Sequence, residues 1–124
     1  LKAMGEVIDV KSELELDLLS TVSGSGPAYV FRFIEALEEA AVKRGFESVS
    51  ARKMAILTVV GAAKLAVQSS DSPAQLRINV TSKGGTTAEA LRVMQEHHFM
   101  EMMDEAIQAA FDRSQVLADE LGKN

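Results

Sequence analysis

The feature that most constrains the fold is an apolar segment in the middle of the chain. Ser50 can cap a helix over about residues 51–69, and its central part, residues 56–63, is apolar on nearly every side. A helix of this kind has to be buried all round. One chain of 124 residues can hardly surround it, so burial by a second copy of the chain is the simpler solution. The small residues at 61–63 would allow two backbones to approach closely.

Composition supports a single helical domain and excludes several classes of partner. Hydrophobic residues make up 47% of the chain and aromatic residues only 5%, which suits close packing of helices rather than a sheet sandwich. The net charge of -5 argues against a nucleic-acid partner. The longest apolar run, residues 54–67, is too short to span a bilayer, so we expect no membrane partner. The absence of cysteine excludes thiolate chemistry and suits the cytoplasm, where we expect the protein.

Capping signals divide most of the chain into helices. Ser12 with Glu15 forms one capping box, and Ser72 followed by Pro73 marks another helix start. Gly45 is placed to end a helix. The expected helices span about residues 12–21, 27–44, 51–69, 73–80, 86–96 and 100–121, and the pair His97 and His98 interrupts the pattern before the last one. The sequence therefore predicts an all-α domain of six or seven helices.

The first ten residues do not fit this pattern. Residues 1–4 could end a helix with Gly5 as its stop, and the β-branched residues between 7 and 10 could form a short strand. Because a lone strand has no partner, we expect residues 1–11 to be the tail of an upstream nucleotide-binding domain, with residues 12–124 as the helical domain. The first residue is not methionine, which also leads us to expect a piece of a longer protein.

The polar stretch over residues 80–89 is a candidate anion site. Gly84 and Gly85 can take conformations with positive φ, and Thr86 with Glu89 has the spacing of a capping box. The free N–H groups and the dipole of the helix start favour a negative charge. We therefore expect the loop to hold a small carboxylate or phosphate. The simpler alternative is a well-capped turn between two helices.

Other chemistry finds little support in the sequence. There is no Ser-His-Asp order, H-E-x-x-H, P-loop or G-x-G-x-x-G, so no cofactor-binding residue is expected in this segment. The run Gly24-Ser25-Gly26 lacks the third glycine of a dinucleotide loop and has no adequate strand before it. His97 and His98 are adjacent, so on a helix they point about 100° apart and no metal site is expected.

Four stretches in order resemble one family. They are Ser-Gly-Ser-Gly-Pro-Ala-Tyr-Val-Phe at 23–31, Gly-Ala-Ala-Lys at 61–64, Pro-Ala-Gln-Leu at 73–76 and Val-Thr-Ser-Lys-Gly-Gly-Thr-Thr at 80–87. Together they resemble the C-terminal domain of pyrroline-5-carboxylate reductase, over nearly the whole chain from about residue 12. The resemblance implies reduction of 1-pyrroline-5-carboxylate to L-proline, the last step of proline biosynthesis, with NADPH or NADH.

The resemblance also implies an architecture. Members of this family have an N-terminal Rossmann domain followed by a helical dimerisation domain like the C-terminal part of 6-phosphogluconate dehydrogenase. The helical domains of two subunits interleave into a homodimer, and some members form larger rings of dimers. The first residues would then be a remnant of the Rossmann sheet. NADPH or NADH would be bound mainly by the upstream domain, so the 124-residue segment should be inactive alone.

Site roles follow from the matching loop. The resemblance implies that Ser82, Gly84, Gly85, Thr86 and Thr87 grip the substrate carboxylate. It further implies that the hydroxyl of Thr87 hydrogen-bonds the ring nitrogen, which makes Thr87 the candidate catalytic residue. The protein then needs only to orient an imine that is already electrophilic once protonated.

Three departures from the family pattern leave alternatives open. The family usually has proline where this chain has Lys83, and this lysine could contact the carboxylate or point to water. Ser70-Asp71-Ser72 replaces a segment that often carries an acidic residue and histidine, and His97-His98 replaces a frequent Gly-Gly. The alternatives are a reductase of another cyclic imine and a non-catalytic helical oligomerisation module.

Overall fold

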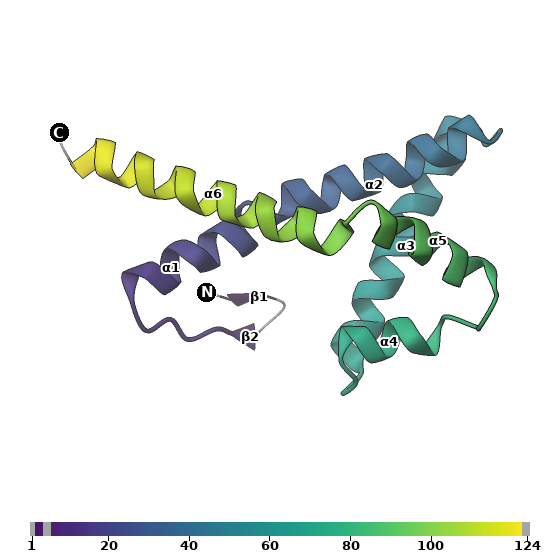
Figure 1. The fold of residues 1–124 in the computed structure, drawn as a ribbon, viewed down its shortest axis with the longest axis horizontal. Coiled ribbons are helices and arrows are strands. Elements are labelled where there is room, and N and C mark those ends of the chain that lie inside the picture. The colour runs from purple at the N-terminus through teal and green to yellow at the C-terminus, as the bar shows by residue number, and fades with distance from the viewer. Residues whose placement is uncertain (1, 4–5, 123–124) are drawn as a thin grey trace. The chain divides into compact units, whose positions relative to one another are not determined.

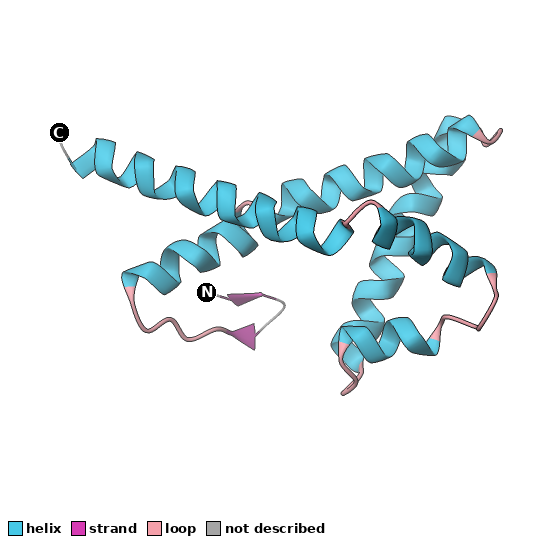
Figure 2. Ribbon diagram, in the orientation of Figure 1, coloured by secondary structure: helices cyan, strands magenta, loops and turns pink. Residues whose placement is uncertain are grey.

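The computed structural model describes residues 2–3 and 6–122. These residues are predominantly helical, with two short strands near the N-terminus (Figures 1 and 2). The helical elements of the described part are α1 (Glu13–Leu19), the π-helical segment η1 (Ser20–Gly24), α2 (Gly26–Lys43), α3 (Ser48–Gln68), α4 (Pro73–Asn79), α5 (Thr86–Glu96) and α6 (Phe99–Gly122). The all-α class predicted from the sequence is confirmed.

The chain divides into two compact units. One contains Tyr29–Phe99, and therefore most of α2 together with α3, α4 and α5. The other combines Leu1–Ala28 with Met100–Asn124, and its described residues form the strands, α1, η1, the first residues of α2 and nearly all of α6. The candidate loop at residues 80–89 lies entirely in the first unit.

The N-terminal residues form a minimal hairpin. Strand β1 (Lys2–Ala3) pairs antiparallel with β2 (Glu6–Val7), with Lys2 opposite Val7 and Ala3 opposite Glu6. The expected helix end over residues 1–4 is therefore wrong for Lys2 and Ala3, and residues 8–10 lie outside the strand. The rest of that prediction concerns residues 1, 4 and 5, which are outside the described residues. A two-stranded ribbon this short has little stability of its own.

Helix α1 begins where the capping signal predicts. The Ser12 hydroxyl oxygen accepts a hydrogen bond from the Glu15 amide at 3.1 Å. The carboxylate of Glu15 accepts from the Lys11 amide at 2.7 Å, so the return bond of the capping box reaches one residue further back than expected. At the other end of the chain, Gln115 of α6 donates to the Asp17 carboxylate of α1 at 2.8 Å.

The helix continues past the expected end as η1. The Ser25 amide donates to the Ser20 carbonyl at 3.0 Å, five residues back, which is the hydrogen bond of a π-helix. Hydroxyls support this turn, because Thr21 donates to the Asp17 carbonyl at 2.9 Å and Ser23 to the Leu19 carbonyl at 2.8 Å. The sequence pattern did not predict the π-helical turn.

Helix α2 is terminated by the predicted glycine, which lies two residues after its last residue, Lys43. Gly45 has φ 108°, and the Phe46 amide donates to the Ala41 carbonyl at 3.2 Å in the manner of a Schellman motif. Helix α3 starts at Ser48, with Glu47 in extended conformation before it, so the expected cap at Ser50 is wrong. The Arg52 guanidinium on α3 pairs with the Glu38 carboxylate on α2 at 2.9 Å.

The buried part of the molecule is small. On α3, Ala51 is 1% exposed and Ala55, one turn later, is 4% exposed. Seven larger apolar residues of the same helix are exposed, namely Val49, Met54, Ile56, Leu57, Val60, Leu65 and Val67. No large side chain among the described residues is fully buried. The prediction that one chain cannot cover this helix is confirmed for the part of the chain described.

The later helices have well-defined ends. The Ser72 hydroxyl accepts from the Gln75 amide at 3.1 Å and Pro73 is the first residue of α4, as predicted. Helix α5 matches its predicted bounds and is followed by His98 at φ 57°. A left-handed conformation is costly for a residue with a side chain, so His98 occupies a position that suits glycine. It separates α5 from α6, which begins at Phe99.

Candidate functional site

The candidate loop is a tight turn anchored to the end of α4. The Thr81 amide donates to the Ile78 carbonyl at 3.0 Å, and the Thr81 hydroxyl donates to the Arg77 carbonyl at 2.6 Å. The next turn is closed by the Gly85 amide, which donates to the Ser82 carbonyl at 3.1 Å. Gly84 has φ 72° at the third position of this turn, as a type II turn requires. The two glycines thus set the path of the backbone into α5.

Gly85 is required by close approach rather than by its own dihedral angles. A Cβ atom at this position would lie 2.5 Å from the Ser82 hydroxyl and 3.3 Å from the Ser82 carbonyl oxygen. The hydroxyl could rotate away, but the carbonyl belongs to the hydrogen bond that closes the turn. A side chain at residue 85 would therefore disturb both Ser82 and the turn.

The expected capping box at the start of α5 does not form. Gly85 is the residue that precedes the helix, and it offers no side chain for a capping hydrogen bond. Thr86 is already the first helical residue, and the Glu89 side chain bonds Arg92 instead of reaching back. Within the described part of the chain, the amides of residues 86–88 find no hydrogen-bond acceptor. These donors are available to an anion.

An open depression of ≈ 500 Å³ lies beside this helix start. It is lined by Gly84, Gly85, Thr86, Ala88, Glu89 and Arg92. Three of the five predicted site residues, Gly84, Gly85 and Thr86, therefore contribute directly to it. Ser82 closes the preceding turn, and Thr87 is exposed on the first turn of α5 without lining the depression. The structure places all five in one loop and the helix turn that follows it.

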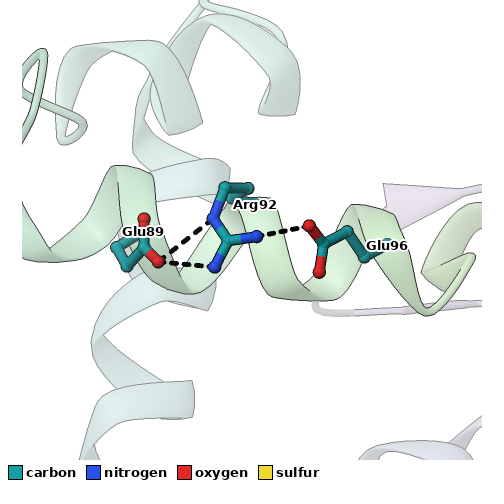
Figure 3. A network of polar contacts seen from close by, with 3 residues as sticks. All are labelled: Glu89, Arg92 and Glu96. Atoms are coloured by element: carbon teal, nitrogen blue, oxygen red, sulfur yellow. Dashed lines mark hydrogen bonds and ion pairs between the residues drawn. The ribbon is translucent and has the colours of Figure 1, made fainter.

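Sequence reasoning missed an ion-pair network along α5. Figure 3 shows Arg92 between two carboxylates: its Nε and Nη2 atoms lie 3.0 and 2.6 Å from Glu89, and Nη1 bonds Glu96. The hydrogen bond from Arg92 holds the pKa of the Glu89 carboxyl below its usual value, and the same contact raises the pKa of Arg92. The helical spacing of residues 89, 92 and 96 could have revealed this network.

The described residues contain neither a candidate metal site nor a candidate membrane-spanning helix. Their histidines and acidic residues form no group of three or more that could hold a metal ion. Their helices also fall short of the combination of length and apolar character that crossing a bilayer requires.

Comparison with known proteins identifies the family. Residues 13–117 match the family described as pyrroline-5-carboxylate reductase dimerisation. The chain is similar to pyrroline-5-carboxylate reductases of Pseudomonas aeruginosa (38% identity, covering 99% of this chain and 45% of the relative) and Synechocystis sp. (43% identity, covering 98% and 43%). The chain thus spans less than half the length of these relatives. It belongs to the pyrroline-5-carboxylate reductase dimerisation family.

Solved structures agree with this assignment. A pyrroline-5-carboxylate reductase from Coxiella burnetii superposes with a TM-score of 0.84 at 41% identity, covering 87% of this chain and 40% of that protein. The Plasmodium falciparum pyrroline carboxylate reductase, solved with NADP bound, gives a TM-score of 0.82 at 32% identity, covering 86% and 40%. The superposed part of this chain therefore shares its helical fold with the corresponding part of these reductases.

Proposed function

We propose that this chain supplies the dimer interface and the substrate-carboxylate loop of an NAD(P)H-dependent reductase that converts 1-pyrroline-5-carboxylate to L-proline. The observation that carries the proposal is the match of residues 13–117 to the dimerisation family of this reductase. In this proposal residues 12–124 form the helical domain. Residues 1–11 belong to the end of a nucleotide-binding domain, which would hold most of NADPH or NADH.

The loop supports binding of a small carboxylate. Uncapped amides at residues 86–88 can donate to the carboxylate oxygens, and the absence of a side chain at Gly85 lets the ligand come close to the backbone. NADPH or NADH, when bound, supplies the hydride. The hydroxyl of Thr87 then holds the ring nitrogen of the protonated imine in place. No ionisable acid or base is needed from this loop, since the protonated imine is already electrophilic.

The exposed apolar face of α3 supports a homodimer. Leu57 is 56% exposed and Leu65 57% exposed, and covering such side chains is a main source of association energy between subunits. We propose that the same face of a second copy covers them through interleaved helices, and that such dimers can assemble into a ring. A small-molecule substrate and a cytoplasmic location complete the proposal.

The central experiment is the substitution Thr87→Ala in the full-length protein that carries this chain. Loss of a hydrogen bond to a charged group should lower kcat/KM for 1-pyrroline-5-carboxylate by about tenfold to a hundredfold. Thr87→Ser is the matched control and should retain most of the activity. Sedimentation should show the same dimer for all three proteins, because residue 87 is not on α3.

Three other results would correct the proposal. Unchanged turnover by the Thr87→Ala protein would remove the role of this hydroxyl. Reduction of other cyclic imines but not of 1-pyrroline-5-carboxylate would favour the alternative substrate class. We expect the 124-residue chain by itself to be inactive, because most of the cofactor would be bound by the upstream domain. NADPH-dependent turnover by this chain alone would contradict that assignment.

A further inference from the structure

We propose that Lys83 is a specificity-determining residue of the loop, whose ammonium group attracts and holds the carboxylate of the ligand. The inference rests on the proposed function, because it takes the loop and helix start at residues 82–88 as the place where that carboxylate binds. It adds a residue that the resemblance to the family does not provide, since the family usually has proline at this position.

The geometry of the turn leaves the side chain of residue 83 free for such a role. Lys83 is the second residue of the turn that the Gly85 amide and the Ser82 carbonyl close at 3.1 Å. Proline is favoured at this position of a type II turn, and most other residues are accepted there. The turn forms with lysine as well, and Gly84 keeps φ 72°. The fold of the loop therefore does not depend on the lysine.

The charge of Lys83 is not used within the chain. Lys83 is exposed, and in the described residues its ammonium group makes no hydrogen bond or ion pair. The cation that lines the neighbouring depression, Arg92, is in contrast held by both Glu89 and Glu96. One guanidinium against two carboxylates leaves an excess of one negative charge along this side of α5. A further cation would therefore strengthen the attraction for an incoming carboxylate, and Lys83 is the cation nearest to the start of α5 in the sequence.

The position of Lys83 is also electrostatically unfavourable until an anion binds. The lysine precedes the start of α5, where the helix dipole disfavours a cation and favours an anion. The amides of residues 86–88 also present N–H donors to this region, and Gly85 has no side chain that could accept a hydrogen bond from them. A bound carboxylate would satisfy the amides and the ammonium group together. This combination predicts a ligand contact rather than a contribution to the stability of the free protein.

The test measures binding of two ligands to the full-length protein by calorimetry. L-proline carries the carboxylate, and L-prolinamide lacks it. Lys83→Met should weaken proline binding by about threefold to fivefold, the size of a solvent-exposed charge contact, and leave prolinamide binding unchanged. Lys83→Arg should retain proline affinity. Lys43→Met, which removes an exposed lysine from the end of α2, is the matched control and should change neither.

Thermal unfolding and salt provide a second readout. Without ligand, the Lys83→Met protein should unfold at the same temperature as the unaltered protein or slightly higher, because an unfavourable cation is gone. The salt dependence of proline affinity should be smaller in this variant. Equal proline affinity in the two proteins, or an equal loss for proline and prolinamide, would overturn the role of Lys83. The proposed function fails by a different measurement, namely absence of imine reduction by the unaltered protein.

Discussion

Helices α3 and α5 belong to the same unit, yet they differ in how their side chains are buried or paired within the chain. Helix α3 carries apolar residues around its whole circumference, and the described part of the chain buries only two residues of this helix, Ala51 and Ala55. Helix α5 has half-buried Leu91 and Met94 on one side and a network of charged side chains along its length. The first helix leaves most of its large apolar side chains exposed. The second pairs charged side chains along its own length, and its first amides have no acceptor among the described residues.

This difference suits the two helices to two different roles, namely association with a protein partner and binding of a small anion. An apolar helix without a polar face gains stability only by being covered, so α3 is suited to a protein partner. A short helix with its own ion pairs and an uncapped start is suited to a small anion. Substitutions on α3 should therefore change assembly, while substitutions around the start of α5 should change ligand binding. The predictions that follow test this separation, beginning with the largest effect.

The largest effect is expected from a charge on the apolar face of α3. Leu57→Asp places a carboxylate at a side chain that is 56% exposed in this chain and covered in the proposed dimer. Burying an unpaired charge costs about 3 kcal/mol or more, which corresponds to a dimer dissociation constant raised at least about a hundredfold. Sedimentation at micromolar concentration should show monomers. Ser70→Asp, in the loop after α3, adds the same charge and should leave the dimer intact.

An intermediate effect is expected from adding one methyl group to each of two glycines. In Gly85→Ala the new Cβ would press on Ser82, so proline affinity should fall by about fivefold while the dimer persists, a cost of roughly 1 kcal/mol. In Gly61→Ala the new Cβ meets no atom of the described residues within 4 Å, apart from the nearby backbone of its own helix. This second change should weaken the dimer instead, since a small residue there allows close approach of the partner.

The two glycine variants distinguish local from intermolecular packing. Calorimetry with L-proline and sedimentation should be run on both proteins. A tighter dimer for Gly61→Ala would mean that the gain in helix propensity outweighs any steric cost, and that no backbone approaches residue 61. A dissociated dimer for Gly85→Ala would show that the loop contributes to assembly, which would break the separation between the two helices.

The smallest effect is expected from the ion pairs of α5. Arg92 holds the pKa of Glu89 below the ordinary value of 4.5 in the folded protein. A lowered pKa means that the pair favours the folded state above pH 4.5 and that this contribution is lost as the pH falls through the lowered value. A carbon-detected NMR titration should give a Glu89 pKa that rises in Arg92→Gln and does not change in Arg77→Gln. An unshifted Glu89 in the unaltered protein would contradict the network.

Local signals predicted most element boundaries correctly. Ser12, Ser72 and Pro73 start helices, and Gly45 ends one, because each acts through hydrogen bonds within a few residues. The errors have equally local causes. Ser50 looked like a cap, but the Ala51 amide donates to the Glu47 carbonyl at 2.9 Å, so the helix had already begun.

Two other features, the partner of the Glu89 carboxylate and the backbone conformation of His98, were not predicted. The Glu89 carboxylate could have bonded the backbone at the helix start or the guanidinium of Arg92, and the charged partner was selected. The interruption at His97 and His98 was visible in the sequence, but the left-handed conformation of His98 was not. This conformation is uncommon for residues with a side chain, so local propensity gave no signal for it.

The sequence by itself determined the all-α class, the position of the candidate loop and the need to cover the apolar helix. These properties follow from periodicity and from contacts between near neighbours along the chain. Only the tertiary structure decided that Gly85 lies against Ser82, that Arg92 is neutralised while Lys83 is not, and that α3 buries just two alanines in one chain. Such facts depend on distances between atoms and on accessible surface, which the order of residues does not specify.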